Sequence, residues 1–300
     1  MRVNANLVPD ILADLSQSQS AVNTYLQQVA TGKSVAVPSD NPAASAEMVQ
    51  NTIDTADVDQ YTQNASSVLA TAQTTSSVLS TVVSSLTQAV SVGTEGANGT
   101  NSSANRAALA QQVQSILASV VSDANTSVDG NYLFAGTAST AAPYAADPTS
   151  PSGYAYNGNN DSNSVEVGDH LSVQVNLPGS QIFSDASNNV LGALSTLASA
   201  LLSGDTSQIS SATSAVSSAI NTVSQAQGFY SNVESQLNAQ ESALQQDKVT
   251  LTTQENNLIG VDMATAATEL SQAETANSAA MAAAAKVLPN TLLNYLSVPT

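Results

Sequence analysis

Side chains that could support catalysis are scarce in this sequence. His170 is the single histidine, and it stands in Gly168-Asp169-His170, directly before a segment that alternates apolar and polar residues. A histidine-dependent triad would have to use this residue, but its setting favours a structural interpretation, in which His170 lies in a turn before a strand. The chain has no cysteine, which excludes thiolate chemistry and disulfides. We therefore expect that the protein is not an enzyme.

An Asn- and Asp-rich segment, residues 157–166, has some likeness to a calcium-binding loop. Such a loop needs oxygen ligands at fixed positions, and Val165 occupies a position where a ligand would be required. A turn-rich connection between two strands is the better interpretation of this segment. The sequence also has no glycine-rich phosphate-binding motif and no cluster of metal ligands, so we expect neither a cofactor nor a metal.

Charge and hydropathy exclude further classes of partner. The chain has 23 acidic and 5 basic residues, for a formal net charge of -18. The basic residues form no patch: they are Arg2, Lys33, Arg106, Lys248 and Lys286. Nucleic acids and anionic lipids are bound by clustered cations, so we exclude both. No apolar run approaches the ~18 residues of a membrane span, and the N-terminus lacks the apolar core of a conventional signal peptide.

Amphipathic helices are predicted at both ends of the chain. The first covers residues 8–30 and ends at Gly32, a residue that suits a helix C-terminus. The last covers residues 261–296, with a break at Pro289, and its apolar stripe is narrow and built of small residues. These stripes lack partner surface within one chain, so we expect them to pack on neighbouring subunits. The expected assembly residues are Leu15, Val22, Val29, Leu270, Ala273, Ala280, Ala284, Val287, Leu292, Leu293 and Leu296.

Long helices are predicted next to these ends. One runs from Ala43 to about Val92, and another spans residues 103–127. The strongest pattern is an apolar residue at every seventh position from Ile209 to Leu258, which predicts a long helix in a left-handed supercoil. Its second seam becomes polar towards the end, so we expect it to pack on helices of its own chain. The glycines expected to break the first of these helices are Gly93, Gly96 and Gly99. The expected coiled-coil core residues are Tyr230, Leu237, Leu244, Leu251 and Leu258.

Residues 131–187 differ from the rest of the chain. Gly, Pro, Asn and Tyr are concentrated here, and the apolar residues from Leu171 to Leu177 alternate with polar ones, as in a half-buried strand. The predicted fold class is therefore mainly α, a long antiparallel coiled-coil helical bundle with a small β-rich insert domain. Its predicted parts are an N-terminal assembly segment (1–42), the coiled-coil bundle (43–130 and 188–260), the outer insert (131–187) and a C-terminal assembly segment (261–300).

Three groups of residues resemble the flagellin superfamily, in the same order along the chain. They are Ala30-Thr31-Gly32-Lys33 followed by Pro38-Ser39-Asp40-Asn41-Pro42, the run from Asp129 to Thr137 with Gly130, Phe134 and Gly136, and the tail with Asp262-Met263-Ala264 and the run from Leu292 to Leu296. The Pro-Ser-Asp-x-Pro version is similar to the hook–filament junction branch of the superfamily, whereas flagellins usually carry an Asp-Asp-Ala-Ala-Gly type of sequence. The departures are Asn41, where a second Asp is common, and Ser34 and Val35, where basic residues are usual.

The resemblance implies a structural subunit of the bacterial flagellum that joins the hook to the filament. Its partners would be the first hook-associated protein below it, flagellin above it, and copies of itself in a ring. The protein would be extracellular, exported without a cleaved signal peptide through the flagellar type III apparatus, with the help of an export chaperone.

Two other functions remain open. A short divergent flagellin would share the fold and the export route but would form the filament itself. A coiled-coil binding or adhesion protein would have no role in a filament, and the motifs at both chain ends disfavour it.

Overall fold

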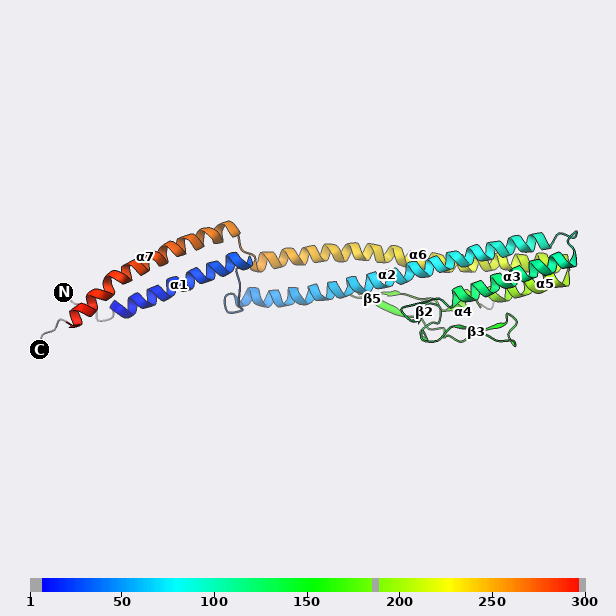
Figure 1. The fold of residues 1–300 in the computed structure, drawn as a ribbon, viewed down its shortest axis with the longest axis horizontal. Coiled ribbons are helices and arrows are strands. Elements are labelled where there is room, and N and C mark those ends of the chain that lie inside the picture. Colours follow the sequence, from blue (N-terminus) through cyan, green and yellow to red (C-terminus); the bar gives the residue numbers. More distant parts are fainter. Residues whose placement is uncertain (1–6, 185–188, 297–300) are drawn as a thin grey trace. The chain divides into compact units, whose positions relative to one another are not determined.

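The computed structural model describes residues 7–184 and 189–296 (Figure 1). Most of these residues are helical, and the described strands pair in separate two-stranded sheets. The helices are α1 (Leu7–Thr31), α2 (Pro42–Gly96), α3 (Ser103–Ala124), α4 (Gly179–Ile182), α5 (Val190–Ser203), α6 (Thr206–Ile259) and α7 (Met263–Leu296). The strands are β1 (Ser127–Val128), β2 (Asn131–Tyr132), β3 (Tyr144–Ala146), β4 (Tyr154–Tyr156), β5 (Ser164–Gly168) and β6 (Leu171–Gln174). The predicted class, mainly α with long helices and a small β-rich insert, is confirmed.

The chain divides into two compact units. The terminal unit combines Met1–Asp57 with Asp247–Thr300, and the central unit is Val58–Gln246. Helices α2 and α6 contribute residues to both. The two units differ in how many apolar side chains they bury.

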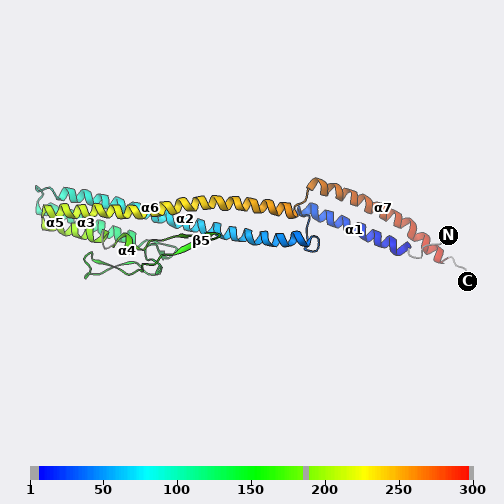
Figure 2. The same ribbon diagram turned by 180° about the vertical axis from the view of Figure 1, so that it is seen from behind.

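In the terminal unit, α1 and α7 lie side by side and run antiparallel (Figures 1 and 2). Helix α1 ends where predicted, because Gly32 adopts a left-handed φ of 70° and its N–H donates to the carbonyl of Gln28 over 2.8 Å. The hydroxyl of Tyr25 on α1 donates to the carboxylate of Glu269 on α7, and the charge and hydrogen bond of that carboxylate raise the pKa of the tyrosine. A polar contact thus joins the two helices.

The predicted break at Pro289 is wrong, because α7 continues to Leu296. A proline removes one main-chain donor from a helix, and its ring crowds the carbonyl four residues earlier. The remaining hydrogen bonds of a long helix can therefore hold the turns on either side of it.

A contiguous apolar core runs through the central unit. It is built by α3 and α5, which lie side by side, and by the parts of α2 and α6 that belong to this unit (Figure 2). The seven-residue ladder of α6 supplies side chains that are at most 3% exposed: Ile209, Val216, Val223, Tyr230, Leu237 and Leu244. This part of the ladder therefore faces helices of its own chain.

One of the glycines expected to break the second helix lies inside α2, so that expectation is wrong for Gly93, whereas the helix does end at Gly96. A Cβ on Gly93 would overlap the hydroxyl of Thr213 on α6, and a Cβ on Gly96 would overlap Leu201 on α5. The absence of side chains lets these helices approach α2 closely. The resulting contacts outweigh the ~1 kcal/mol that glycine costs in a helix interior. Only Gly99 lies beyond the end of α2.

The insert between α3 and α5 consists of three β-hairpins and the short helix α4. Asp129 and Gly130 form the turn between β1 and β2 with φ values of 52° and 81°, a conformation typical of an Asp-Gly hairpin turn. His170 lies in the turn between β5 and β6 with a φ of 59°, and its side chain is 94% exposed. This position agrees with the turn interpretation of His170.

Aromatic rings pack on one another inside the insert and are part of the core that the helices share. Phe134 and Phe183 are fully buried and meet edge to face, with ring centroids 5.2 Å apart. Tyr144 packs on Phe183 and on Tyr156 at 5.9 and 5.3 Å. Asn125 exchanges two hydrogen bonds of 2.9 Å with the main chain of Tyr144, one from each end of its amide. This pairing anchors the chain directly after α3, which ends short of its predicted boundary.

Many hydroxyl groups on the helices donate to the main-chain carbonyl four residues earlier. Examples from both units are Thr24 to Ser20, Thr52 to Met48, Thr87 to Val83 and Thr213 to Ile209. Such bonds satisfy the donor within its own helix. The polar helix faces are therefore covered largely by small groups rather than by charged pairs.

Asp123, near the end of α3, gives stability a dependence on pH. Its Oδ2 is buried without a hydrogen-bond partner, and burial raises the pKa of the carboxyl. The unfolded chain therefore loses this proton at a lower pH than the folded protein does. Above the unfolded pKa of about 3.9, Asp123 lowers the free energy of unfolding, and well below that pH it does not. We expect Asp123→Asn to raise the melting temperature at pH 7 and to leave it unchanged near pH 3.

Asp169→Asn is the matched control for this prediction, because the side chain of Asp169 is 86% exposed. Thermal melting followed by circular dichroism at both pH values gives the comparison. Equal stabilisation by the two variants at pH 7 would contradict a penalty that comes from burial.

Candidate functional site

The loops that follow α1 and α6 pair through their main chains. Lys33 and Gly260 form an isolated β-bridge, and the N–H of Val261 donates to the carbonyl of Gly32 over 3.1 Å. The ammonium of Lys33 also lies 3.3 Å from the carboxylate of Glu255. Both side chains are partly exposed, so this ion pair contributes at most about 1 kcal/mol. The Gly32-Lys33 motif thus lies where the loop after α1 meets the loop after α6.

Asp40 and Asn41 organise the loop before α2. The carboxylate of Asp40 accepts hydrogen bonds of 3.0 Å from the N–H groups of Ala36 and Val37. The side chain of Asn41 accepts from the N–H of Ala44 over 3.1 Å and caps α2. The other motif residues of this loop, Pro38, Ser39 and Pro42, are exposed. Local hydrogen bonds therefore fix the direction in which the chain enters α2.

The predicted assembly residues lie on the two terminal helices. Those that are half-buried are Leu15, Val22, Val29, Leu270, Ala273 and Ala280, and Ala284 is buried. Val287, Leu292, Leu293 and Leu296 lie outside the residues whose side chains the structure describes. Because α1 and α7 are adjacent, the stripes are partly covered within the chain itself.

Large exposed apolar side chains are concentrated elsewhere in the terminal unit. Among the described residues, eight of the nine large exposed ones belong to it: Leu12, Leu26, Val37, Val49, Ile53, Val249, Met263 and Met281. The ninth, Leu202, belongs to the central unit. The apolar side chains described as buried in the terminal unit are only Ala44, Ile259, Ala266 and Ala284. An exposed apolar surface beside so small a core is typical of an interaction site.

One apolar stripe on α2 was not predicted. It consists of Ala46, Val49, Ile53 and Ala56, all exposed. Their spacing of three, four and three residues places them on one face of the helix. Asn51, on the opposite face, is buried and donates to the carbonyl of Leu251 on α6 over 3.0 Å. The stripe therefore points away from α6, and its spacing was the signal that could have revealed it.

The predicted coiled-coil core residues fall into two groups. Tyr230, Leu237 and Leu244 are buried in the central unit, whereas Leu251 and Leu258 belong to the terminal unit and are half-buried. In the second family motif, Phe134 and Gly136 are buried and Gly130 is exposed at its turn.

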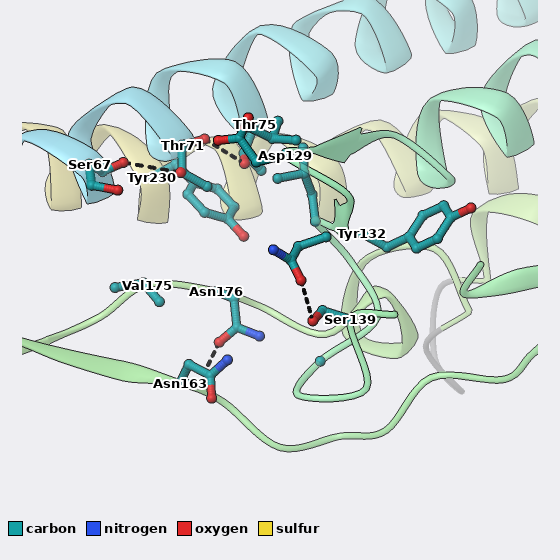
Figure 3. Close-up of a pocket in the computed structure, with 14 residues that line it drawn as sticks. Ser67, Thr71, Thr75, Asp129, Tyr132, Ser139, Asn163, Val175, Asn176 and Tyr230 are labelled. Carbon is teal, nitrogen blue, oxygen red and sulfur yellow. Dashed lines mark hydrogen bonds between the residues drawn. The ribbon is translucent and has the colours of Figure 1, made fainter. Parts of the chain in front are cut away.

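A polar cavity of about 400 Å³ lies in the central unit (Figure 3). Thr71 and Thr75 line it from α2, Tyr230 from α6, and Asn163 and Asn176 from the segments that flank the β5–β6 hairpin. Its wall combines hydroxyl and amide groups with the apolar side chains of Val128, Leu133 and Val175. No sequence pattern predicted this cavity, since its residues are far apart in the chain.

The described part of the chain offers no group of three or more His, Asp and Glu side chains that could hold a metal ion. Within the same residues, no helix is both long and apolar enough to cross a membrane.

The sequence matches two models of one protein family. Residues 4–139 match the bacterial flagellin N-terminal helical region, and residues 213–296 match the bacterial flagellin C-terminal helical region. In this order the two matches cover more than half of the chain and reach both of its ends. The chain belongs to the bacterial flagellin family. The Gly32-Lys33 contact is therefore one between the N-terminal and C-terminal regions of a flagellin-family protein.

Within the flagellin family, the chain is similar to flagellar hook-associated protein 3 of Escherichia coli strain K12, with 30% identity over 183 residues. The match covers 59% of this chain and 55% of that protein. The chain thus spans little more than half the length of this relative.

Solved structures of flagellar proteins share the fold. A candidate flagellar hook-associated protein from Vibrio parahaemolyticus has a TM-score of 0.68 at 21% identity, over 74% of this chain and 100% of that one. The flagellar junction protein FlgL from Legionella pneumophila has a TM-score of 0.60 at 14% identity, over 71% of this chain and 100% of that one.

Proposed function

We propose that this flagellin-family protein is a structural subunit that joins the hook to the filament of the bacterial flagellum, and that it is not an enzyme. The observation that carries the proposal is the concentration of exposed apolar side chains in the terminal unit, whereas the central unit has a core of its own. A subunit of this kind completes its burial only against neighbouring subunits.

The parts of the chain then have distinct roles. Residues 1–42 and 261–300 are the assembly segments, residues 43–130 and 188–260 form the body, and residues 131–187 form the outer insert. The exposed stripe of Ala46, Val49, Ile53 and Ala56 supports an assembly surface that extends beyond residue 42 along α2.

The junction role is supported over the filament role by the printed names of similar proteins. One is a flagellar hook-associated protein 3, and another is a flagellar junction protein. The Pro38-Ser39-Asp40-Asn41-Pro42 sequence points the same way. The alternative, a short divergent flagellin that forms the filament itself, is not favoured by these names.

In this role the protein contacts the first hook-associated protein on one side and flagellin on the other, and copies of itself complete a ring. It leaves the cell through the flagellar type III apparatus with an export chaperone, and it resides outside the cell in the flagellum. The resemblance to the junction branch and the terminal apolar surface support these partners.

Polar replacement of two leucines on α1 tests the assembly surface. Leu12 and Leu26 are each 52% exposed, so Leu12→Gln with Leu26→Gln should change the stability of the free subunit little. About half of each side chain remains to be buried against a neighbour, which contributes about 0.8–1.5 kcal/mol and corresponds to a roughly four- to tenfold loss of affinity for each residue. We expect cells with the double variant to keep their hooks and to release filament protein into the medium.

The matched control is Gln17→Asn with Gln27→Asn, at exposed polar positions of the same helix, which should leave filaments attached. Normal filaments in the leucine variant would place the contact away from α1. Seeding filament fragments with the wild-type protein separates the two flagellar roles, and micrometre-long homopolymers there would favour the flagellin alternative.

A further inference from the structure

We propose that Asn98 is a site of spontaneous deamidation, at which the chain converts its own asparagine to aspartate or isoaspartate. This site does not depend on the proposed role in the flagellum. It is inferred from the residue that follows Asn98, from the space around that residue, and from the hydrogen bonds that the Asn98 side chain accepts.

The reaction begins when the main-chain nitrogen of the following residue attacks Cγ of the asparagine side chain. Asn98 is followed by Gly99, which has no Cβ to crowd that attack. Nothing lies within 4 Å of the position that a Cβ on Gly99 would take, so the main chain has room to rotate. Both residues are exposed in the loop between α2 and α3, so water reaches the reacting atoms.

Thr100 engages the carbonyl oxygen of the Asn98 side chain. Its N–H and its hydroxyl donate to Oδ1 of Asn98 over 3.1 and 2.9 Å. The ring closed by the N–H bond contains both Cγ of Asn98 and the nitrogen of Gly99, which holds the reacting atoms in one turn. Negative charge grows on Oδ1 as the new bond forms, and donors that already point at such an oxygen stabilise that charge. Thr100 therefore favours the attack.

The reaction releases ammonia and consumes water, and it needs no other co-reactant. In the first step, a bond forms between the nitrogen of Gly99 and Cγ of Asn98, and the bond from Cγ to Nδ2 breaks. The proton of the Gly99 nitrogen leaves with Nδ2, so ammonia is released and a cyclic imide remains. In the second step, water adds to one of the imide carbonyls and opens the ring. The product is aspartate or isoaspartate, depending on which carbonyl reacts.

The product changes the loop at the end of α2. Its carboxylate adds a negative charge near the C-terminus of the helix, where the helix dipole is already negative. In isoaspartate the main chain runs through Cγ and gains one carbon. The N–H of Asn101 donates to the main-chain carbonyl of Asn98 over 3.1 Å and closes the turn of this loop, so the longer chain must rearrange this turn.

A second Asn-Gly pair, Asn157-Gly158, provides a comparison within the same molecule. A Cβ on Gly158 would overlap the hydroxyl of Tyr156 and the carbonyl of Ala135. That hydroxyl donates to the carbonyl of Asn159 over 2.8 Å, and the N–H of Asn159 donates to the carbonyl of Ala135 over 3.1 Å. The main chain around Gly158 is therefore enclosed and cannot rotate freely, so we expect Asn157 to react slowly.

Incubation of the full-length protein at pH 8, followed by protease digestion and mass spectrometry, tests the site. We expect the peptide with Asn98 to convert to its acid at least about tenfold faster than the peptide with Asn157. In concentrated urea the two rates should become similar, because the fold no longer encloses Gly158. Equal rates in the folded protein, or a difference that persists unchanged in urea, would overturn the proposal.

Substitutions of the two neighbours test their separate contributions. Gly99→Ala places a Cβ beside the attacking nitrogen in open space, so it should slow the reaction at least about tenfold and leave the fold intact. Thr100→Val removes the hydroxyl donor and should slow the reaction about threefold. Thr94→Val is the matched control, because the hydroxyl of Thr94 donates to the carbonyl of Val90 within α2, and it should leave the rate unchanged. An unchanged rate at Asn98 in either of the first two variants would overturn the proposal.

Discussion

Leu237→Asp is expected to destabilise the central unit by about 4 kcal/mol or more, a large part of the ~5–15 kcal/mol that holds a typical domain together. Leu237 is fully buried in the ladder of α6. The substitution removes its apolar contacts and places a charged carboxylate in an apolar core, where its loss of water is costly. Urea unfolding followed by circular dichroism measures the loss, and an unchanged midpoint would mean that this ladder faces solvent.

Asn238→Asp isolates the effect of burial, because it adds the same charge at the next, exposed position. We expect it to change stability by no more than about 0.5 kcal/mol. A buried aspartate also has a raised folded pKa, so the charge-dependent part of the Leu237→Asp penalty should shrink as pH falls from that raised pKa towards the unfolded value of about 3.9. A penalty that is equal at pH 3 and pH 7 would assign the loss to packing alone.

Gly136→Ala is expected to destabilise the insert by about 3 kcal/mol in total. The residue has a φ of 71°, where any side chain costs about 1–2 kcal/mol. A Cβ there would also overlap the main-chain carbonyl of Asn159, which cannot withdraw freely. The N–H of Asn159 donates to Ala135, and its side-chain oxygen accepts from the N–H of Thr137. Overpacking of this kind adds about 1–3 kcal/mol.

Gly130→Ala separates the two contributions. Gly130 has a similar φ of 81°, but nothing lies within 4 Å of the position that its Cβ would take. We expect it to cost only the conformational part, about 1–2 kcal/mol. Melting curves of both variants give the difference, and equal losses would show that the contact between Gly136 and Asn159 relaxes without strain.

The helices of this protein could be predicted because their signals are local or periodic. Seven-residue spacing marked the ladder of α6, and Gly32 and Gly204 end helices with left-handed φ values of 70° and 78°. Capping by Asn41 depends on residues within one turn, so the start of α2 could also be predicted from the sequence. In such cases the sequence neighbours of a residue decide its conformation.

The wrong and missing predictions concern features that are determined by residues far apart in the sequence. Gly93 stays helical because Thr213 approaches it, and nothing near Gly93 in the sequence shows that approach. The polar cavity of the central unit is built from five separate segments of the chain, which no spacing rule can assemble. In the candidate site, the stripes on α1 and α7 were visible as amphipathic patterns. The structure was needed to show that these two stripes partly cover each other and that Leu12 and Leu26 remain exposed.

The hydroxyl groups that donate within their own helices, such as Thr52 and Thr213, affect how these helices respond to force. A hydroxyl whose proton is already engaged is covered by a neighbour with less desolvation than a charged side chain. Small side chains also let two helices approach closely. Contacts between such uniform faces change little in energy when one helix slides along another, whereas matched charges favour one register. An assembly held by these faces would therefore be compliant, able to bend and recover without breaking specific contacts.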